Sequence, residues 1–263
     1  PAGPYARLDV VPFTGSTNDD LVRAAAQHPG RWPDLSVLTT DDQRAGRGRL
    51  GRTWTTPPRA AIAVSVLLRP AVTPAAWAWL PLLTGLAVTE AVDRVAGVRC
   101  GVKWPNDVLV ELPDGREGKV CGIRSEVPPG GAAVVVGIGV NVSQTADELP
   151  VPTATSLALA GAATTDRDTV LRAVLRSFAG TYTTWTAAGG DVASSGLAAR
   201  VRERCWTLGR PVSVELPGDE VLEGTAGDLD DDGRLVVTDA AGRRRRVAAG
   251  DVVHARIDGE PDR

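Results

Sequence analysis

The segment QRAGRGRLGRTW, residues 43–54, holds the densest group of side chains that could do chemistry. Arg47, Arg49 and Arg52 each stand next to a glycine. A guanidinium group binds carboxylate or phosphate through a planar fork, and glycine lets backbone approach a ligand closely. This arginine loop suits a small, multiply anionic ligand, and Trp54 could stack on a base. A basic surface loop and a nucleic-acid-binding arm are the alternatives.

The overall charge argues against the nucleic-acid arm. The 263 residues include 29 basic and 32 acidic side chains, for a net charge of -3, so any affinity for anions must be local. Only two histidines are present, and chemistry must therefore rest on Lys, Arg, Asp and backbone amides. Cys100, Cys121 and Cys205 are too few and too scattered for a metal site or a disulfide framework, which favours a reducing, cytoplasmic setting. We expect no signal peptide and no membrane segment.

The elements that must position the loop are read from periodicity. A helix should begin at Ser16 or Thr17, and a second should cover 74–96 with a break or kink near Pro81 and Gly85. A third, amphipathic helix runs from Asp168 to Trp185. The predicted strands are 9–13, 36–40, 61–68, a strand region at 102–110, and a hairpin of 119–127 with 132–142.

The pattern changes after about Arg204. Short strands at 212–216, 221–228, 235–239 and 245–249 alternate with turn residues and predict a small β-barrel. We therefore expect an α+β protein with a catalytic domain at 1–204 and a C-terminal β-domain at 205–263. The run of four arginines at 243–246 is best explained as a solvated strand edge.

Five polar residues lie in or beside apolar strands and should converge on one anionic ligand with the arginine loop: Lys103, Asn106, Asp107, Lys119 and Asn141. Standard nucleotide motifs are not matched. Residues 115–120 lack the first glycine and the Ser/Thr of a phosphate loop, and 137–142 lack the last glycine of the dinucleotide fingerprint.

Five blocks resemble the biotin protein ligases, in the order seen in that family. The blocks are SerThrAsn (16–18), the arginine loop (43–54), LysTrpProAsnAsp (103–107), LysValCysGlyIle (119–123) and GlyIleGlyValAsn (137–141). The small C-terminal β-domain matches too. The resemblance covers nearly the whole chain, and the joint occurrence of the second and third blocks is very specific. It implies a catalytic domain similar to class II synthetase folds, followed by an SH3-like barrel.

The resemblance also implies a reaction. Biotin would be activated by MgATP as biotinyl-5′-AMP, and a lysine of a biotin carboxyl carrier domain, as in acetyl-CoA carboxylase, would then attack this mixed anhydride. The arginine loop would close over the adenylate and exclude water. The cofactors expected are biotin and ATP as substrates, with Mg²⁺ accompanying ATP and no separate metal site.

The resemblance assigns roles to matched positions. The catalytic residues would be Lys119, Arg47, Arg49 and Asp107. Biotin would be bound by Ser16, Thr17, Asn18, Gln43, Gly46, Arg47, Lys119, Gly122, Gly137 and Gly139. ATP would be bound by Arg49, Arg52, Trp54, Lys103, Asn106, Lys119 and Asn141. Asp107 would either orient the carrier lysine or help to hold the metal.

Two departures and two rivals complete the expectations. Many relatives carry an N-terminal DNA-binding domain, whereas the first family block begins here by residue 16, so we expect no DNA binding. Arg124 stands where the family commonly has an aliphatic residue. The rivals are a lipoate or octanoate ligase on the same fold and a non-catalytic biotin-binding module. We expect a monomer or a weak homodimer.

Overall fold

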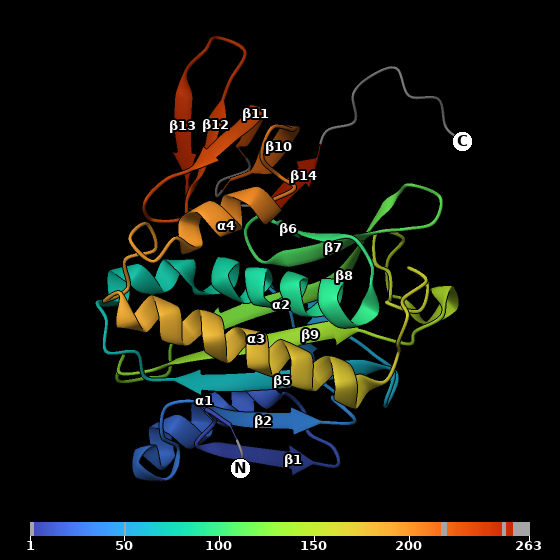
Figure 1. Cartoon of the computed structure of the whole chain (residues 1–263), viewed down its shortest axis with the longest axis vertical. Helices are drawn as coiled ribbons and strands as arrows, with labels where there is room; N and C mark the ends of the chain where they lie inside the picture. The colour runs from blue at the N-terminus through green and yellow to red at the C-terminus, as the bar shows by residue number, and fades with distance from the viewer. Residues whose placement is uncertain (1–2, 50, 217–219, 249–250, 255–263) are drawn as a thin grey trace.

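A seven-stranded mixed sheet forms the centre of the larger part of the molecule (Figure 1). The computed structural model describes residues 3–49, 51–216, 220–248 and 251–254. In spatial order the strands are β1 (Arg7–Val11), β2 (Ser36–Thr40), β5 (Ala61–Leu68), β9 (Val134–Asn141), β8 (Glu117–Glu126), β7 (Asp107–Glu111) and β6 (Cys100–Lys103). Strands β1 and β2 are parallel and every other neighbouring pair is antiparallel.

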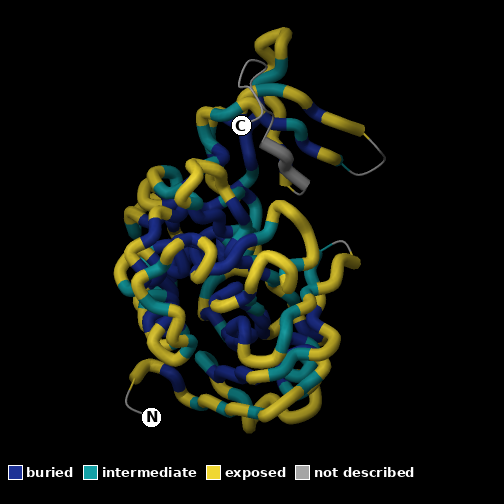
Figure 2. Tube along the Cα trace, turned by 90° about the vertical axis from the view of Figure 1, so that its right-hand side faces the viewer, coloured by how far each residue is buried: buried dark blue, intermediate teal, exposed yellow. Residues whose placement is uncertain are grey.

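The two faces of this sheet have different coverings. Helices α2 (Leu80–Ala96) and α3 (Arg167–Ala187) lie across one face, and α1 (Thr17–Gln27) packs on the other, near β2 and β5 (Figure 1). Alternation along β5 divides the strand accordingly, because Val64 and Val66 join the large core cluster while Leu67 joins the smaller cluster with Leu21 of α1. The buried residues fill the space between these layers (Figure 2).

One helical segment, 74–96, is long and apolar enough to cross a membrane by length and composition alone. Two thirds of its most apolar window is buried inside the protein, and it packs against α3 and the sheet. The segment is therefore explained as the central core helix.

Strand β8 contains a β-bulge. Val108 of β7 pairs with Cys121 and Leu109 pairs with Lys119, so Val120 is an extra residue on β8. Val120 and Cys121 are both fully buried, whereas Lys119 and Gly122 are half-buried on the opposite face. The bulge thus turns Lys119 to the same side as Gly122, although residues three apart in a regular strand face opposite sides.

The C-terminal region forms a separate five-stranded antiparallel sheet. Its order is β13 (Arg244–Val247), β12 (Leu235–Thr238), β11 (Val221–Leu229), β10 (Pro211–Glu215) and β14 (Asp251–His254). Helix α4 (Leu197–Arg204) leads into it. Two indoles of the main body hold this sheet, since Trp79 Nε1 donates to the carbonyl of Asp231 at 2.7 Å and Trp104 Nε1 donates to that of Gly233 at 3.0 Å.

Most predicted elements are confirmed, with shifts at their ends. The strands 36–40 and 61–68 and the antiparallel hairpin of β8 with β9 agree with prediction, and the first strand begins two residues earlier than expected. The region 102–110 is a hairpin of β6 and β7. In the small sheet, β13 is an edge strand with exposed arginines at 244–246, as expected; Ala249 of the predicted strand 245–249 lies outside the described residues.

A break or kink was expected near Pro81 and Gly85: the helix type does change beside Pro81, but a break at Gly85 is wrong, because α2 continues unbroken from Leu80 to Ala96. A 3₁₀ helix, η2 (Pro74–Trp79), passes directly into α2, and Pro81 falls in the first turn of α2, where its missing N–H has no intrahelical partner to lose. Gly85 continues the helix and gives room to Val102, which would lie 3.1 Å from an added Cβ. Helix α4, strand β14 and the short strands β3 (Gly46–Arg47) and β4 (Thr53–Trp54) were not predicted.

Candidate active site

A cluster of buried polar side chains lies where the start of α1 meets the middle of β5. The Thr17 hydroxyl is 2.8 Å from the Ser65 hydroxyl, and Ser65 Oγ donates to Asn18 Oδ1 at 2.9 Å. Gln43 Oε1 accepts from the Thr17 backbone N–H at 3.0 Å. Ser16 is also buried, but its hydroxyl caps α1 by accepting from the Asp19 N–H. Thr17, Asn18 and Gln43, which were predicted to bind biotin, therefore share one network with Ser65.

The glycines of β8 and β9 form a flat floor beside this cluster. Gly122 and Gly139 stand opposite each other on the two strands, and Gly137 pairs with Ser65 of β5. A Cβ on Gly137 would lie 2.5 Å from Asn18 Oδ1, so only glycine allows this approach. Because these positions carry no side chain, other groups can lie directly against the backbone.

The indole of Trp54 lies on that floor. An added Cβ at Gly122 would be 2.8 Å from Trp54 Cζ3, and one at Gly139 would be 2.7 Å from Trp54 Cε2. Gly46 is equally restricted, since its Cβ would come within 2.5 Å of the Trp54 carbonyl oxygen. Trp54 Nε1 is buried and has no hydrogen-bond partner within the described part of the chain. The structure thus joins Trp54 to the glycines predicted for biotin, whereas the sequence assigned it to ATP.

The predicted reacting centre adjoins the same floor. Lys119 Nζ lies 2.8 Å from Asp107 Oδ1, and Asp107 stands opposite Gly122. Asn106 Nδ2 donates to Asp107 Oδ1 at 3.2 Å, and Asn106 Oδ1 accepts from Arg49 Nη1 at 2.8 Å. The Lys119 ammonium is also 5.9 Å from the centre of the Trp54 ring. These contacts bring four of the predicted residues into one charged group.

The other predicted cations, Arg47, Lys103 and Arg52, have separate surroundings. Arg47 reaches back to α1, where its Nε is 3.3 Å from Asp19 Oδ2. Lys103 stands opposite Asp107 in the β6–β7 hairpin. Arg52 closes the tip of the arginine loop, since its carbonyl accepts from the Gly48 N–H at 2.7 Å.

Asn141 extends the floor two residues beyond Gly139. It is buried; its Nδ2 donates to the Thr155 carbonyl at 2.9 Å and its Oδ1 accepts from Gln144 Nε2 at 2.9 Å. Next to it, Gln144 Oε1 and Thr155 Oγ1 are buried without a hydrogen-bond partner in the described residues. An ordered water or a polar ligand would supply the missing partner of such atoms.

Sequence reasoning missed several residues of this region. Ser65 carried a signal, a single hydroxyl within the apolar strand AIAVSVLL. Arg124 was singled out without a role; it now binds the Gly48 carbonyl at 2.7 Å and an oxygen of Glu126 at 3.2 Å. Gln144 and Thr155 had no signal, because their proximity to Asn141 depends on the fold of the segment after β9.

The cysteines are not part of the chemistry. All three are unpaired and buried. Burial raises the pKa of the Cys121 thiol, and it raises that of Cys100 to about 12. Cys121 therefore stays a neutral thiol on the core side of the bulge, as expected for a packing residue.

A metal ion would have few protein ligands here. Among the side chains that the structure describes, in residues 3–49, 51–216 and 220–248, no group of three or more His, Cys, Asp or Glu could hold one. Mg²⁺ bound with a nucleotide commonly uses one or two carboxylates together with phosphate oxygens. The residues fit such an ion, because Asp107 of the charged group could supply one carboxylate oxygen.

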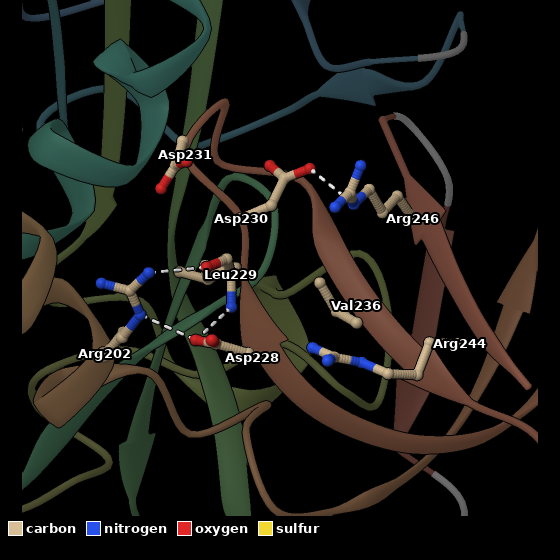
Figure 3. A pocket seen from close by; sticks show the side chains of 8 residues that line it. All are labelled: Arg202, Asp228, Leu229, Asp230, Asp231, Val236, Arg244 and Arg246. Carbon is tan, nitrogen blue, oxygen red and sulfur yellow. Dashed lines mark hydrogen bonds and ion pairs between the residues drawn. The ribbon is translucent and has the colours of Figure 1, made fainter. Parts of the chain in front are cut away.

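One cavity lies away from these residues. A cavity of about 520 Å³ separates α4 from β11 to β13, and none of the predicted site residues lines it (Figure 3). Arg202 donates to Asp228 at 2.7 Å and to the Leu229 carbonyl at 2.6 Å, and Arg246 faces Asp230 (Figure 3). The charged residues that line the cavity are largely paired with each other, which is typical of the interface between two packed elements.

Two family models match the chain. The model described as the biotin/lipoate A/B protein ligase family matches residues 10–143, and that described as the biotin protein ligase C-terminal domain matches residues 207–255. A biotin–[acetyl-CoA-carboxylase] ligase of Mycobacterium tuberculosis is 44% identical over 256 residues, covering 96% of this chain and 90% of that protein. One of Paracoccus denitrificans is 32% identical, covering 90% and 96%.

Solved structures agree with this. A biotin protein ligase from Aquifex aeolicus, in complex with biotin and ATP, has a TM-score of 0.76 at 26% identity, covering 96% of this chain and 100% of that one. A biotin protein ligase from Leishmania major in complex with biotinyl-5-AMP shares the fold, with a TM-score of 0.60, 23% identity, and coverage of 94% and 100%. The chain therefore belongs to the biotin/lipoate A/B protein ligase family and, within it, to the biotin protein ligases.

Proposed function

We propose that this chain joins biotin to a lysine of a biotin carboxyl carrier domain, such as that of acetyl-CoA carboxylase, through a biotinyl-5′-AMP intermediate made from biotin and MgATP. The observation that carries the proposal is the position of the Lys119–Asp107 pair. It stands beside a glycine floor that leads to the buried polar cluster of Thr17, Asn18 and Ser65. The site can thus hold a polar head group and present charge to an acid at the other end of the ligand.

In the first half-reaction a carboxylate oxygen of biotin attacks the α-phosphorus of ATP, and the bond to pyrophosphate breaks. Both reactants are anionic, so their approach needs fixed positive charge. Lys119, Arg47 and Arg49 supply it. In the unliganded protein Arg47 is paired with Asp19 and Arg49 with Asn106. The substrate anions would replace these two residues as partners of the arginines. Mg²⁺ would neutralise part of the phosphate charge.

In the second half-reaction the carrier amine attacks the carbonyl carbon of the mixed anhydride. AMP leaves with the electron pair of the broken carbon–oxygen bond, and the amine loses a proton as the amide forms. Asp107 is placed to orient that amine or to hold the metal ion, because its carboxylate already holds one ammonium group, that of Lys119. The arginine loop would cover the adenylate between the two steps and exclude water.

The polar cluster favours biotin over the acids of the rival reaction. The ureido ring of biotin has one carbonyl and two N–H groups, and these need hydrogen-bond partners inside a pocket. An octanoyl chain has no such groups. The polar atoms of Ser65, Asn18 and Gln43 would lose contact with water on binding it and would gain no hydrogen bond in return. We place Trp54 with biotin as well, because its ring lies on the glycine floor.

The nucleotide would extend toward the partnerless atoms near Asn141. We place Lys103, Arg52, Asn106 and Asn141 on this side, with Gln144 and Thr155 as further candidates.

We also propose a domain boundary between Arg204 and Cys205. The end of α4 and the start of the C-terminal family match at residue 207 support this boundary. The further proposals are a cytoplasmic setting, supported by three unpaired cysteines, a monomer or weak homodimer, and no role in DNA binding.

One experiment tests both half-reactions. A purified apo carrier domain is incubated with this protein, MgATP and an equal mixture of biotin, lipoate and octanoate, and its intact mass is measured. A mass gain matching biotin alone supports the proposal. A lipoyl or octanoyl gain assigns the protein to the rival reaction, and no gain with biotin still bound assigns it a binding role without catalysis.

A further inference from the structure

Arg124 connects the floor of the site with the arginine loop. Its side chain leaves β8 on the same face as Gly122, and Nη1 donates to the Gly48 carbonyl at 2.7 Å. The side chain is 27% exposed. The reaction steps described above do not use this residue, so its contact needs another explanation.

The partner of Arg124 on β8 belongs to a second network. Glu126 Oε2 accepts from Arg124 Nε at 3.3 Å and lies 3.2 Å from Nη2. The same oxygen is 3.4 Å from Nδ2 of Asn18, whose Oδ1 accepts from Ser65. A continuous series of polar contacts therefore runs from the buried head-group cluster to the carbonyl of Gly48.

Gly48 lies between Arg47 and Arg49, so its position affects both arginines of the loop. The loop makes few described hydrogen bonds to itself. They are the pairing of Gly46 with Trp54 and of Arg47 with Thr53, the bond from the Gly48 N–H to the Arg52 carbonyl, and the bond from the Arg52 N–H to the Arg49 carbonyl. A hydrogen bond from a charged donor is stronger than one between neutral groups. A bond that holds the Gly48 carbonyl therefore also holds the backbone from which the side chains of Arg47 and Arg49 extend.

We propose that Arg124 is a positioning residue that holds the arginine loop over the site through Gly48, and that Glu126 links this hold to Asn18. A ligand in the head-group cluster contacts Asn18, and Asn18 bonds Glu126 of the Glu126–Arg124 pair that binds the loop, so ligand contacts and loop contacts support each other. By linkage, an ordered loop also raises the affinity of the head-group cluster for its ligand. This inference rests on the proposed function for the identity of that ligand, biotin.

The test uses trypsin, which cuts after the arginines of residues 44–52. The parent and Arg124→Leu are digested without ligand and with biotin, and the cleavage rate in this segment is measured. We expect cleavage of the unliganded variant to be about tenfold faster, and its bound biotinyl-AMP to be released about tenfold faster, which is the effect of losing one charge-assisted bond. Arg116→Leu, at an exposed turn, should change neither rate.

Two further variants separate positioning from simple charge balance. Arg124→Leu combined with Glu126→Gln removes both charges; if Arg124 only neutralises Glu126, the double variant should regain slow cleavage, whereas the proposal expects fast cleavage to persist. Glu126→Gln alone should keep slow cleavage without ligand but lose the protection that biotin adds. Arg124→Lys should restore part of the protection.

The digestion without ligand needs no catalysis. A parent protein that fails to biotinylate the carrier would refute the proposed function without changing this result. Equal cleavage of the parent and Arg124→Leu, with both folded by circular dichroism, would overturn the inference about Arg124.

Discussion

Lys119 and Asp107 form an ion pair across β8 and β7, with Nζ 2.8 Å from Oδ1. Asp107 stands directly opposite Gly122, so the pair borders the floor on which the Trp54 indole lies. The ammonium charge is thereby held in place before any anionic ligand binds, and no reorganisation is needed when it does.

Replacing Lys119 should slow adenylate formation. Lys119→Ala removes a positive charge from the reacting centre, and we expect a loss of about 10²–10³-fold in the rate of pyrophosphate release with an unchanged fold. Lys119→Arg, which keeps the charge, should lose less. Near-normal pyrophosphate release from the alanine variant would remove Lys119 from the catalytic role.

A methyl group on the floor should weaken biotin binding. In Gly122→Ala the added Cβ would lie 2.8 Å from the Trp54 ring, and relieving such overpacking costs about 1–3 kcal/mol, or roughly tenfold or more in the biotin Kd. Titration calorimetry measures this. Gly180→Ala in α3 is the control, since no atom lies within 4 Å of its new Cβ, and it should bind biotin as the parent does. Equal Kd values for all three proteins would place biotin elsewhere.

The hydroxyl of Ser65 should act on biotin and not on ATP. Ser65→Ala removes a buried partner of both Thr17 and Asn18, and we expect the KM for biotin to rise about tenfold while the KM for ATP stays constant. Ser36→Ala is a matched control, because Ser36 is also a buried strand serine but bonds the Pro33 carbonyl. A parallel rise in both KM values would assign Ser65 a purely structural role.

Arg49 should retain the adenylate. Arg49→Gly loses the contact with Asn106 and a cation of the loop, so bound biotinyl-AMP should dissociate about tenfold faster or more. Arg44→Gly alters the same loop at a side chain that packs on Phe13 and pairs with Asp42, and it should leave the dissociation rate unchanged. If Arg49→Gly holds the adenylate as long as the parent, the assignment fails.

Alkaline pH should weaken the fold through the buried thiols. Burial raises the pKa of Cys100 from 9.0 to about 12 and also raises the pKa of Cys121 and Cys205. The unfolded chain releases these protons first, so their contribution is constant below pH 9 and the free energy of unfolding falls as the pH rises from 9 toward 12. Urea denaturation at pH 8 and 10 measures this. The fall should be smaller in Cys100→Ala, and an equal fall in both proteins would contradict the attribution.

The sequence predicted the elements whose pattern is local. The strand 61–68 is an uninterrupted apolar run, and the Asp168–Trp185 helix has a clear stripe; both appear within two residues of their predicted ends. The five polar residues in or beside apolar strands were expected to converge on one ligand, but their individual roles came only from the family resemblance, because their meeting point depends on the order of strands in the sheet. The comparisons confirm the family; the individual site roles stay predictions.

What could not be predicted depends on contacts between distant segments. Arg124 bonds Gly48, which lies 76 positions away in the sequence, and no local sequence pattern predicts that bond. Helix α4 has only eight residues, so its pattern was too short to recognise. The place of Trp54 also needed the structure, because its ring lies on two glycines of other strands.

The bulge at Val120 limits how these residues could be transferred to another protein. In a regular strand the spacing from Lys119 to Gly122 would send the lysine into the interior, away from the glycine it serves. A designer who copied these four residues onto an ideal β-scaffold would bury an amino group and obtain an unstable protein without activity. A successful transplant would have to carry the irregular pairing of the neighbouring strand as well.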